Sequence, residues 1–120
     1  DSITASTAPG ISAKIVVEGA NAPTTPQGDA ILNDKGILVV PDILANSGGV
    51  IVSYFEWVQD KQKYFWSADE VIENLNEILM RAINEVAALA QSRGVTWREA
   101  ANMLSVDRVA QAHRLRGLYP

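Results

Sequence analysis

Two loops in the first half of this 120-residue chain carry the residues whose types and spacing best suit chemistry. Residues 18–21 read EGAN and residues 46–50 read NSGGV, and each loop follows a short apolar stretch. In an open α/β sheet, ligands bind beyond the carboxyl ends of the strands. Polar residues at the ends of two neighbouring strands are therefore our first candidates for a binding site.

The second loop predicts one wall of a small-molecule site. If a helix begins near Asn46, the two glycines in its first turn leave backbone N–H groups open to a carboxylate or a phosphate. Spacings of four, three and four residues then place a set of side chains on one helix face, namely Asn46, Val50, Ser53 and Trp57. An amide, a small apolar group, a hydroxyl and a large ring suit a ligand with a carboxylate and an aliphatic part.

Both loops also have plainer interpretations. Asn46 can be an N-cap, the glycines can allow tight helix packing, and Ser53 can bond back to a backbone carbonyl. The amide of Asn21 suits a carboxamide or a sugar hydroxyl, but asparagine is also common in turns that bind nothing. The residue types alone leave these alternatives open.

The elements that must position the loops form a strand, helix and strand unit. Residues 15–17 and 37–40 are short apolar runs typical of buried parallel strands. Between them, Thr25 followed by Pro26 predicts the start of a helix that ends at Gly36. The two strands and the helix make one βαβ unit.

The rest of the chain is predicted to be helical. A helical pattern covers about residues 43–60, with a possible break at the glycine pair. Apolar residues recur at three- and four-residue spacing between Ser67 and Gly94, and the start of this segment has the spacing of a capping box. A last helix opens with a similar box at Thr96 and runs to about Leu115. The predicted fold is α/β, a βαβ unit followed by three or four helices.

The predicted sheet is too small to stand alone. Residues 1–13 predict a lead-in loop, and residues 14–120 predict one domain. Two strands leave both sheet edges unpaired beside apolar side chains. We therefore expect either the terminal portion of a larger doubly wound domain or a chain that associates through its strand edges.

Composition argues against several classes of function. Acidic residues outnumber basic ones by 14 to 10 without basic clusters, which disfavours a nucleic-acid partner. There is no cysteine, and no ligand spacing suggests a metal site. No apolar run is long enough to span a bilayer and no signal peptide is evident, so we expect a soluble, cytoplasmic protein. His113 and the arginines of the last helix are expected on its surface, and Asp42 in a turn or cap.

Three blocks of this sequence resemble, in order, glutamate dehydrogenases of the Glu/Leu/Phe/Val dehydrogenase family: EGANAPTTPQGD, GILVVPDILANSGGVIVSYFEWVQ and REAANMLSVDRVAQAHRLRG. The resemblance covers about residues 14–118 and corresponds to the C-terminal part of the enzyme. It implies the C-terminal portion of a doubly wound, Rossmann-like nucleotide-binding domain with NAD or NADP as cofactor. The implied reaction is oxidative deamination of L-glutamate to 2-oxoglutarate and ammonia, in a homohexamer.

The resemblance also implies roles for individual residues. Asn21 would lie against the nicotinamide ribose, and Asn46 near the nicotinamide and the substrate. Val50 and Ser53 match substrate contacts, with the Ser53 hydroxyl bonding the side-chain carboxylate of glutamate. Leucine and phenylalanine dehydrogenases diverge from this chain over residues 53–59, so glutamate is the favoured substrate.

The same resemblance implies what this chain lacks. The family's catalytic lysine and aspartate, and its glycine-rich dinucleotide fingerprint, belong to regions outside these residues. The segment therefore carries no catalytic residue, and the isolated chain is expected to be inactive. The alternative is a noncatalytic helical association module. Ala22 and Ser47 stand where many family members have glycine and alanine.

Overall fold

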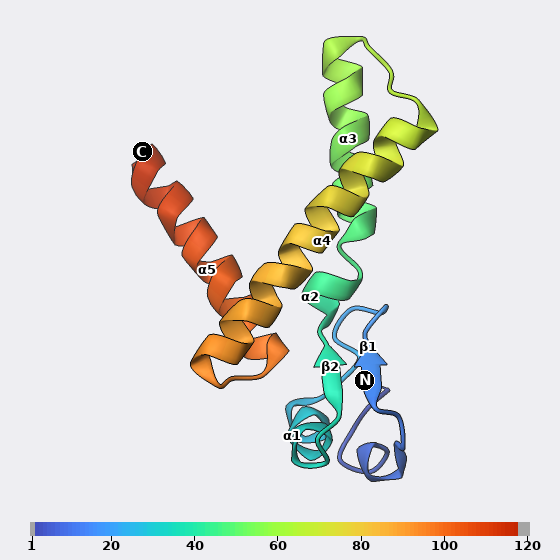
Figure 1. Ribbon diagram of the computed structural model, residues 1–120, viewed down its shortest axis with the longest axis vertical. Coiled ribbons are helices and arrows are strands. Elements are labelled where there is room, and N and C mark those ends of the chain that lie inside the picture. The colour runs from blue at the N-terminus through green and yellow to red at the C-terminus, as the bar shows by residue number, and fades with distance from the viewer. Residues whose placement is uncertain (1, 118–120) are drawn as a thin grey trace.

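A parallel sheet joined to long helices forms the structure, a computed structural model that describes residues 2–117 (Figure 1). The elements in chain order are the 3-10 turn η1 (Ala8–Gly10), β1 (Ile15–Val17), α1 (Pro26–Asp34), β2 (Leu38–Val40), α2 (Asp42–Ala45), α3 (Gly48–Gln62), α4 (Ala68–Arg93) and α5 (Trp97–Arg116). The predicted α/β order, a βαβ unit followed by helices, is confirmed.

The two strands are parallel and in register, with Ile15 opposite Leu38 and Val17 opposite Val40. Their predicted burial is only half right. Val39 of β2 is 5% exposed, but Ile15 and Val17 of β1 are 55% and 65% exposed. The reason is that no further strand or helix within residues 2–117 covers the outer edge and the open face of β1.

Helix α1 begins where the sequence predicts. The Thr25 hydroxyl accepts a hydrogen bond from the Gly28 N–H at 3.1 Å, and Pro26 occupies the first turn. Leu32 is fully buried and packs with Ile37 and Val39, which fixes the helix against β2.

The segment expected to be a lead-in loop packs onto this unit. Ala8, in η1, is fully buried in the same cluster as Leu32. Ile3 forms a parallel bridge with Thr24, and the Thr25 N–H donates to the Ile3 carbonyl at 2.8 Å. The start of the chain thereby braces the loop that leads into α1.

A second core joins α2 to the two long helices. Its buried members are Leu44, Val86, Ala90, Ala100 and Ala101. The small alanines let α5 approach α4 closely, and each of these two helices starts with a complete capping box. Gly94, at φ 65°, makes the left-handed turn between them.

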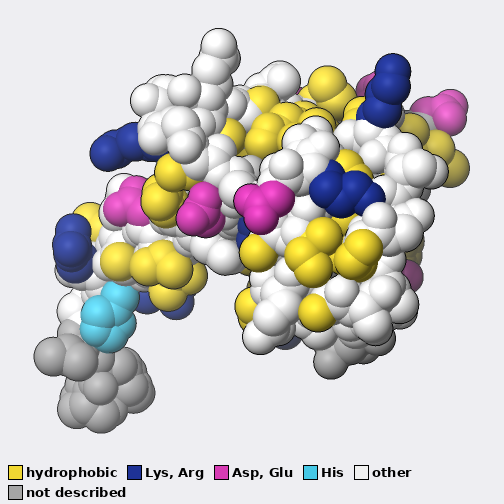
Figure 2. Space-filling model, turned by 90° about the horizontal axis from the view of Figure 1, so that it is seen from below, with side chains coloured by type: hydrophobic (Ala, Val, Ile, Leu, Met, Phe, Trp, Pro, Cys, Tyr) yellow, Lys and Arg dark blue, Asp and Glu magenta, His cyan; other side chains and the backbone are white. Residues whose placement is uncertain are grey.

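Beyond this contact α5 diverges from α4, so that the two helices form a V (Figure 1). Val109 near the end of α5 and Phe65 before α4 are each 70% exposed. Figure 2 shows further hydrophobic side chains gathered in patches at the surface. None of the helices within residues 2–117 has the length and apolar content that crossing a membrane requires.

Gly28→Ala should destabilise the fold, although alanine is ordinarily the better helix former. A Cβ at this position would lie 2.7 Å from the Ile3 carbonyl oxygen, which belongs to the bracing backbone. We expect a loss of about 1–3 kcal/mol in the free energy of unfolding, measured by denaturant titration.

Gly49→Ala is the matched control, because a Cβ there meets nothing within 4 Å. It should leave stability unchanged or raise it by up to about 1 kcal/mol. Equal stability of the two variants would show that the contact between α1 and the Ile3 segment does not constrain the fold.

Candidate functional site

The two asparagine loops meet at the carboxyl ends of the two strands. Asn46 Nδ2 donates a hydrogen bond to Asn21 Oδ1 at 2.7 Å, across 25 residues of sequence. This contact uses one donor and one acceptor of the pair. Within residues 2–117 the other two amide atoms, Asn21 Nδ2 and Asn46 Oδ1, make no further hydrogen bond, and Asn21 is solvent-exposed.

A helix does begin near Asn46, but Asn46 is not part of it. Asn46 ends α2, because its N–H donates to the Asp42 carbonyl at 3.1 Å. The Ser47 hydroxyl then bonds back to the Leu44 carbonyl at 2.8 Å, and α3 starts at Gly48. Asn46 is therefore neither the N-cap of α3 nor a member of its face, but lies at the junction between two helices.

The other three members of the predicted face do share one side of α3. Val50 is 69% exposed and Trp57 is 56% exposed, and Ser53 between them is exposed too. Trp57 stacks on Tyr54 with ring centroids 5.8 Å apart. Within residues 2–117 the Ser53 hydroxyl makes no bond back to a carbonyl, unlike that of Ser47. This face can therefore receive a ligand.

Of the two glycines at the start of α3, one lies at a helix contact and the other leaves the backbone open to a ligand. A Cβ on Gly48 would touch Leu75 and Leu79 of α4 at 3.9 Å, so this glycine lies at the helix contact. Gly49 is exposed with open space around it. Ser47 makes no side-chain cap, which leaves the first-turn N–H groups of α3 without that partner.

A buried ion pair that the residue patterns did not reveal lies behind the first loop. Glu18, directly after β1, is 2% exposed. Arg98 in the first turn of α5 binds it with two hydrogen bonds, Nη2 to Oε1 at 2.7 Å and Nη1 to Oε2 at 3.0 Å. The same Nη2 also donates to Asp29 of α1 at 3.0 Å.

This environment determines the ionisation of Glu18. Burial alone would raise the pKa of the Glu18 carboxyl. The hydrogen bonds from Arg98 and from the Asp42 N–H outweigh burial and hold that pKa below its ordinary value. In turn the Glu18 carboxylate raises the pKa of Arg98, which stays charged.

Asp42 connects the ion pair to the first loop. Its N–H donates to Glu18 Oε2 at 2.9 Å, and its Oδ2 accepts from the Ala22 N–H at 2.7 Å. Ala22 has φ 45°, in the left-handed region that favours glycine. The expectation that Asp42 is a turn or capping residue is wrong, because Asp42 is the first residue of α2 and Pro41 is the N-cap.

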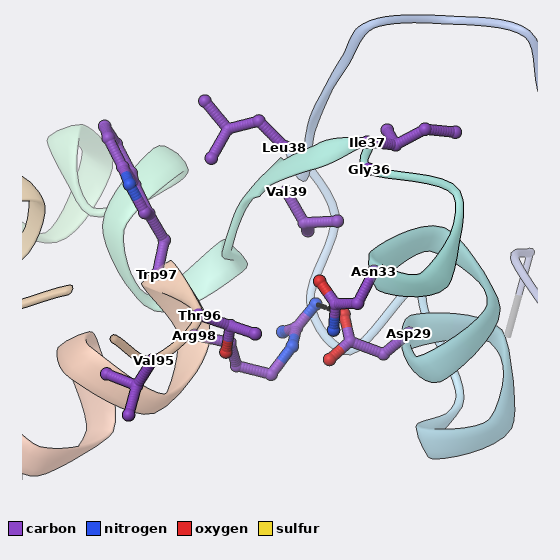
Figure 3. A pocket seen from close by; sticks show the side chains of 10 residues that line it. All are labelled: Asp29, Asn33, Gly36, Ile37, Leu38, Val39, Val95, Thr96, Trp97 and Arg98. Atoms are coloured by element: carbon purple, nitrogen blue, oxygen red, sulfur yellow. Dashed lines mark hydrogen bonds and ion pairs between the residues drawn. The ribbon is translucent and has the colours of Figure 1, made fainter. Parts of the chain in front are cut away.

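The hollows of the surface lie behind the loops rather than at the asparagines. A pocket of about 240 Å³ lies between α1, β2 and the start of α5, and in Figure 3 the Arg98 side chain reaches across it toward Asp29. A second hollow of about 400 Å³ borders Ala22 and Asp42. Neither is lined by the predicted site residues, which lie on open surface. Across residues 2–117 no group of three or more His, Asp or Glu side chains is arranged to hold a metal ion.

Comparisons with known proteins define the class of this chain. Residues 1–117 match the profile of the Glutamate/Leucine/Phenylalanine/Valine dehydrogenase family, and the chain belongs to that family. Among its relatives, the glutamate dehydrogenase of Thermotoga maritima is 56% identical over 110 residues, and an NAD-specific glutamate dehydrogenase of Staphylococcus aureus is 51% identical over 115 residues.

Solved structures agree with the sequence relatives. Glutamate dehydrogenase from Peptoniphilus asaccharolyticus matches 98% of this chain with a TM-score of 0.89 and 49% identity. The hetero-hexameric glutamate dehydrogenase from Thermus thermophilus, in a leucine-bound form, matches 99% with a TM-score of 0.93 and 40% identity. The match to the Thermotoga protein spans 92% of this chain but only 26% of that protein. The match to the Peptoniphilus structure spans 30% of that chain. It is thus similar to about a quarter to a third of a longer enzyme.

Glu18→Gln should weaken the fold in a pH-dependent way. Because the folded pKa of Glu18 is lowered, its stabilising contribution is complete above the ordinary pKa of 4.5 and is lost as pH falls through the folded pKa. We expect the variant to lose about 1.5–3 kcal/mol of unfolding free energy at pH 7, and the deficit to shrink below about pH 4.5.

Glu77→Gln provides the control, since Glu77 forms an exposed pair with Arg81 at 4.0 Å. Its effect should stay below about 0.5 kcal/mol at every pH. A deficit in Glu18→Gln that does not change with pH would contradict an ionised, stabilising Glu18.

Proposed function

We propose that this chain is a segment of an NAD-dependent glutamate dehydrogenase, in which it supplies part of the substrate and nicotinamide site. The observation that carries the proposal is the hydrogen bond between Asn46 and Asn21, which joins two strand-end loops into one polar surface beside α3. The NAD-specific relatives support NAD as the cofactor, and NADP remains the alternative.

This segment fits only the nicotinamide end of the cofactor. Eight glycines occur in the chain and none forms a Gly-x-Gly-x-x-Gly fingerprint, so these residues do not cradle a pyrophosphate. The open amide groups of Asn21 and Asn46 fit the nicotinamide ribose and its neighbourhood. When bound, the dinucleotide accepts the hydride that the amino acid loses. The role of the two asparagines is to orient both molecules.

The exposed face of α3 fits the substrate. Among the described residues 2–117 the Ser53 hydroxyl has no carbonyl partner, and Val50 one turn earlier presents an apolar contact. The uncapped N-terminal turn of α3 adds N–H groups and the positive end of a helix dipole. We infer that the side-chain carboxylate of L-glutamate binds Ser53 while its aliphatic part lies along Val50.

The remaining parts of the activity lie outside this segment. We assign no catalytic residue to these 120 residues and expect the chain alone to be inactive. The strands β1 and β2 fit the end of a Rossmann-like sheet whose other strands would pair with their open edges. The hexameric Thermus relative supports a hexamer for the complete protein, here called the parent enzyme, for which a homohexamer in the cytoplasm is our expectation.

Ser53→Ala in the parent enzyme tests the substrate role. Loss of a hydrogen bond to a charged group should lower kcat/KM for glutamate by an amount equivalent to about 1–3 kcal/mol. Asn46→Ala, at the reacting end, should instead impair turnover of every amino-acid substrate.

Ser105→Ala is the matched control, because the Ser105 hydroxyl bonds back to the Ala101 carbonyl at 2.7 Å within α5. It should leave glutamate kinetics unchanged. The measurement is steady-state kinetics of the three variants. If Ser53→Ala kept the wild-type kcat/KM for glutamate, the proposal that Ser53 binds the substrate would be wrong.

A further inference from the structure

The buried ion pair of Glu18 and Arg98 lies outside the proposed binding surface, but a chain of hydrogen bonds connects it to the Asn21 loop. We propose that Arg98 is a positioning residue, which acts through Glu18 and Asp42 to hold the Asn21 loop in place against Asn46. This rests on the proposed function for its kinetic consequence, but the geometry it concerns is independent of the reaction.

The connection runs through three successive contacts. Arg98 grips both oxygens of the Glu18 carboxylate, 80 residues away in sequence. Glu18 Oε2 also accepts the Asp42 N–H, so that the carboxylate fixes the first residue of α2. Asp42 Oδ2 then accepts the Ala22 N–H at 2.7 Å, next to Asn21. One end of the site is thereby tied to the start of α5.

The loop needs such a tether because its backbone is not in a relaxed state. Ala22 is held at φ 45°, where an L-residue other than glycine is disfavoured. Without the hydrogen bond to Asp42, nothing offsets the cost of positive φ at Ala22, and its backbone should relax to negative φ. That rotation would move the adjacent Asn21 amide away from Asn46.

The other end of the tether is rigid. Arg98 lies in the first turn of α5, within the capping box formed by Thr96 and Glu99. Ala100 and Ala101, two and three residues on, are buried against α4 and α2. The guanidinium therefore projects from a fixed base, and its planar fork matches the carboxylate with two parallel bonds. Lysine retains the charge but not this two-point geometry.

The test uses two variants of the parent enzyme. Arg98→Lys removes the fork. Asp42→Ala removes the acceptor for Ala22 together with the carboxylate that lies 3.8 Å from Arg98 Nη1, but it keeps both partners of the Arg98 to Glu18 hydrogen bonds. Each should lower kcat/KM for NAD by about 10- to 100-fold per folded active site, with KM raised and kcat reduced, because small misplacements of binding groups are costly. Arg108→Lys is the control: Arg108 pairs with Glu85 on the outside of α5, and its kinetics should change less than twofold.

The outcomes separate this proposal from a purely structural role. A structural Arg98 would lower the melting temperature without changing the constants of the folded enzyme. If either variant folds and keeps wild-type constants, Arg98 does not act through Asp42. Should Arg98→Lys fail to fold, Glu18→Gln replaces it, because it weakens the same two-point contact from the other side: wild-type constants in a folded Glu18→Gln would overturn the proposal.

If the wild-type enzyme does not oxidise glutamate, the proposed function is wrong. The positioning role of Arg98 is then tested by a crystal structure of each variant. Separation of Asn46 Nδ2 from Asn21 Oδ1 beyond hydrogen-bond distance would support the positioning role. Retention of the 2.7 Å contact in both variants would overturn it.

Discussion

The buried carboxylate of Glu18 is the constraint on which the arrangement of this chain depends. An ionised carboxylate at 2% exposure is unfavourable unless it is paired and hydrogen-bonded. Glu18 meets both conditions with groups from distant parts of the chain, the Arg98 guanidinium of α5 and the Asp42 N–H of α2. The same guanidinium also binds Asp29 of α1. Four parts of the chain, the end of β1 and the helices α1, α2 and α5, are thus brought to one point behind the strand ends.

The proposed binding surface lies in front of that point. Asn21 and Asn46 come from loops of different strands, and they meet because their strands are parallel and in register. Helix α3 then carries Val50 and Ser53 outward on an exposed face. Burial separates the two kinds of group: the charged side chains of Glu18 and Arg98 lie behind the loops, while the neutral amide and hydroxyl groups that we propose as ligand contacts lie in front. Such neutral groups can orient a charged substrate without neutralising it.

Local signals in the sequence predicted most of the fold. Both capping boxes, the glycine after α4 and the proline in the first turn of α1 act over a few residues, and the structure confirms each of them. The break between α2 and α3 was harder to place, since it depends on the Ser47 hydroxyl turning back to Leu44. The exposure of β1 depends on what covers the sheet, which the β-branched residues of a strand do not reveal.

Long-range contacts account for what the residue patterns missed at the site. Arg98 is 80 residues from Glu18, and no periodicity links them. Both lie within blocks that resemble the family, but a resemblance does not say which residues touch. The left-handed backbone of Ala22 is likewise not evident from its residue type, because alanine ordinarily disfavours positive φ. The substrate and cofactor roles of Asn21, Asn46, Val50 and Ser53 stay predictions.

A crystal structure of the parent enzyme with NAD and glutamate bound tests most directly whether the joined loops and α3 form one ligand site. We expect the nicotinamide ribose within hydrogen-bond distance of Asn21, and the glutamate side-chain carboxylate within hydrogen-bond distance of the Ser53 hydroxyl. Ligands bound away from both loops, with these side chains contacting only water or protein, would contradict this arrangement.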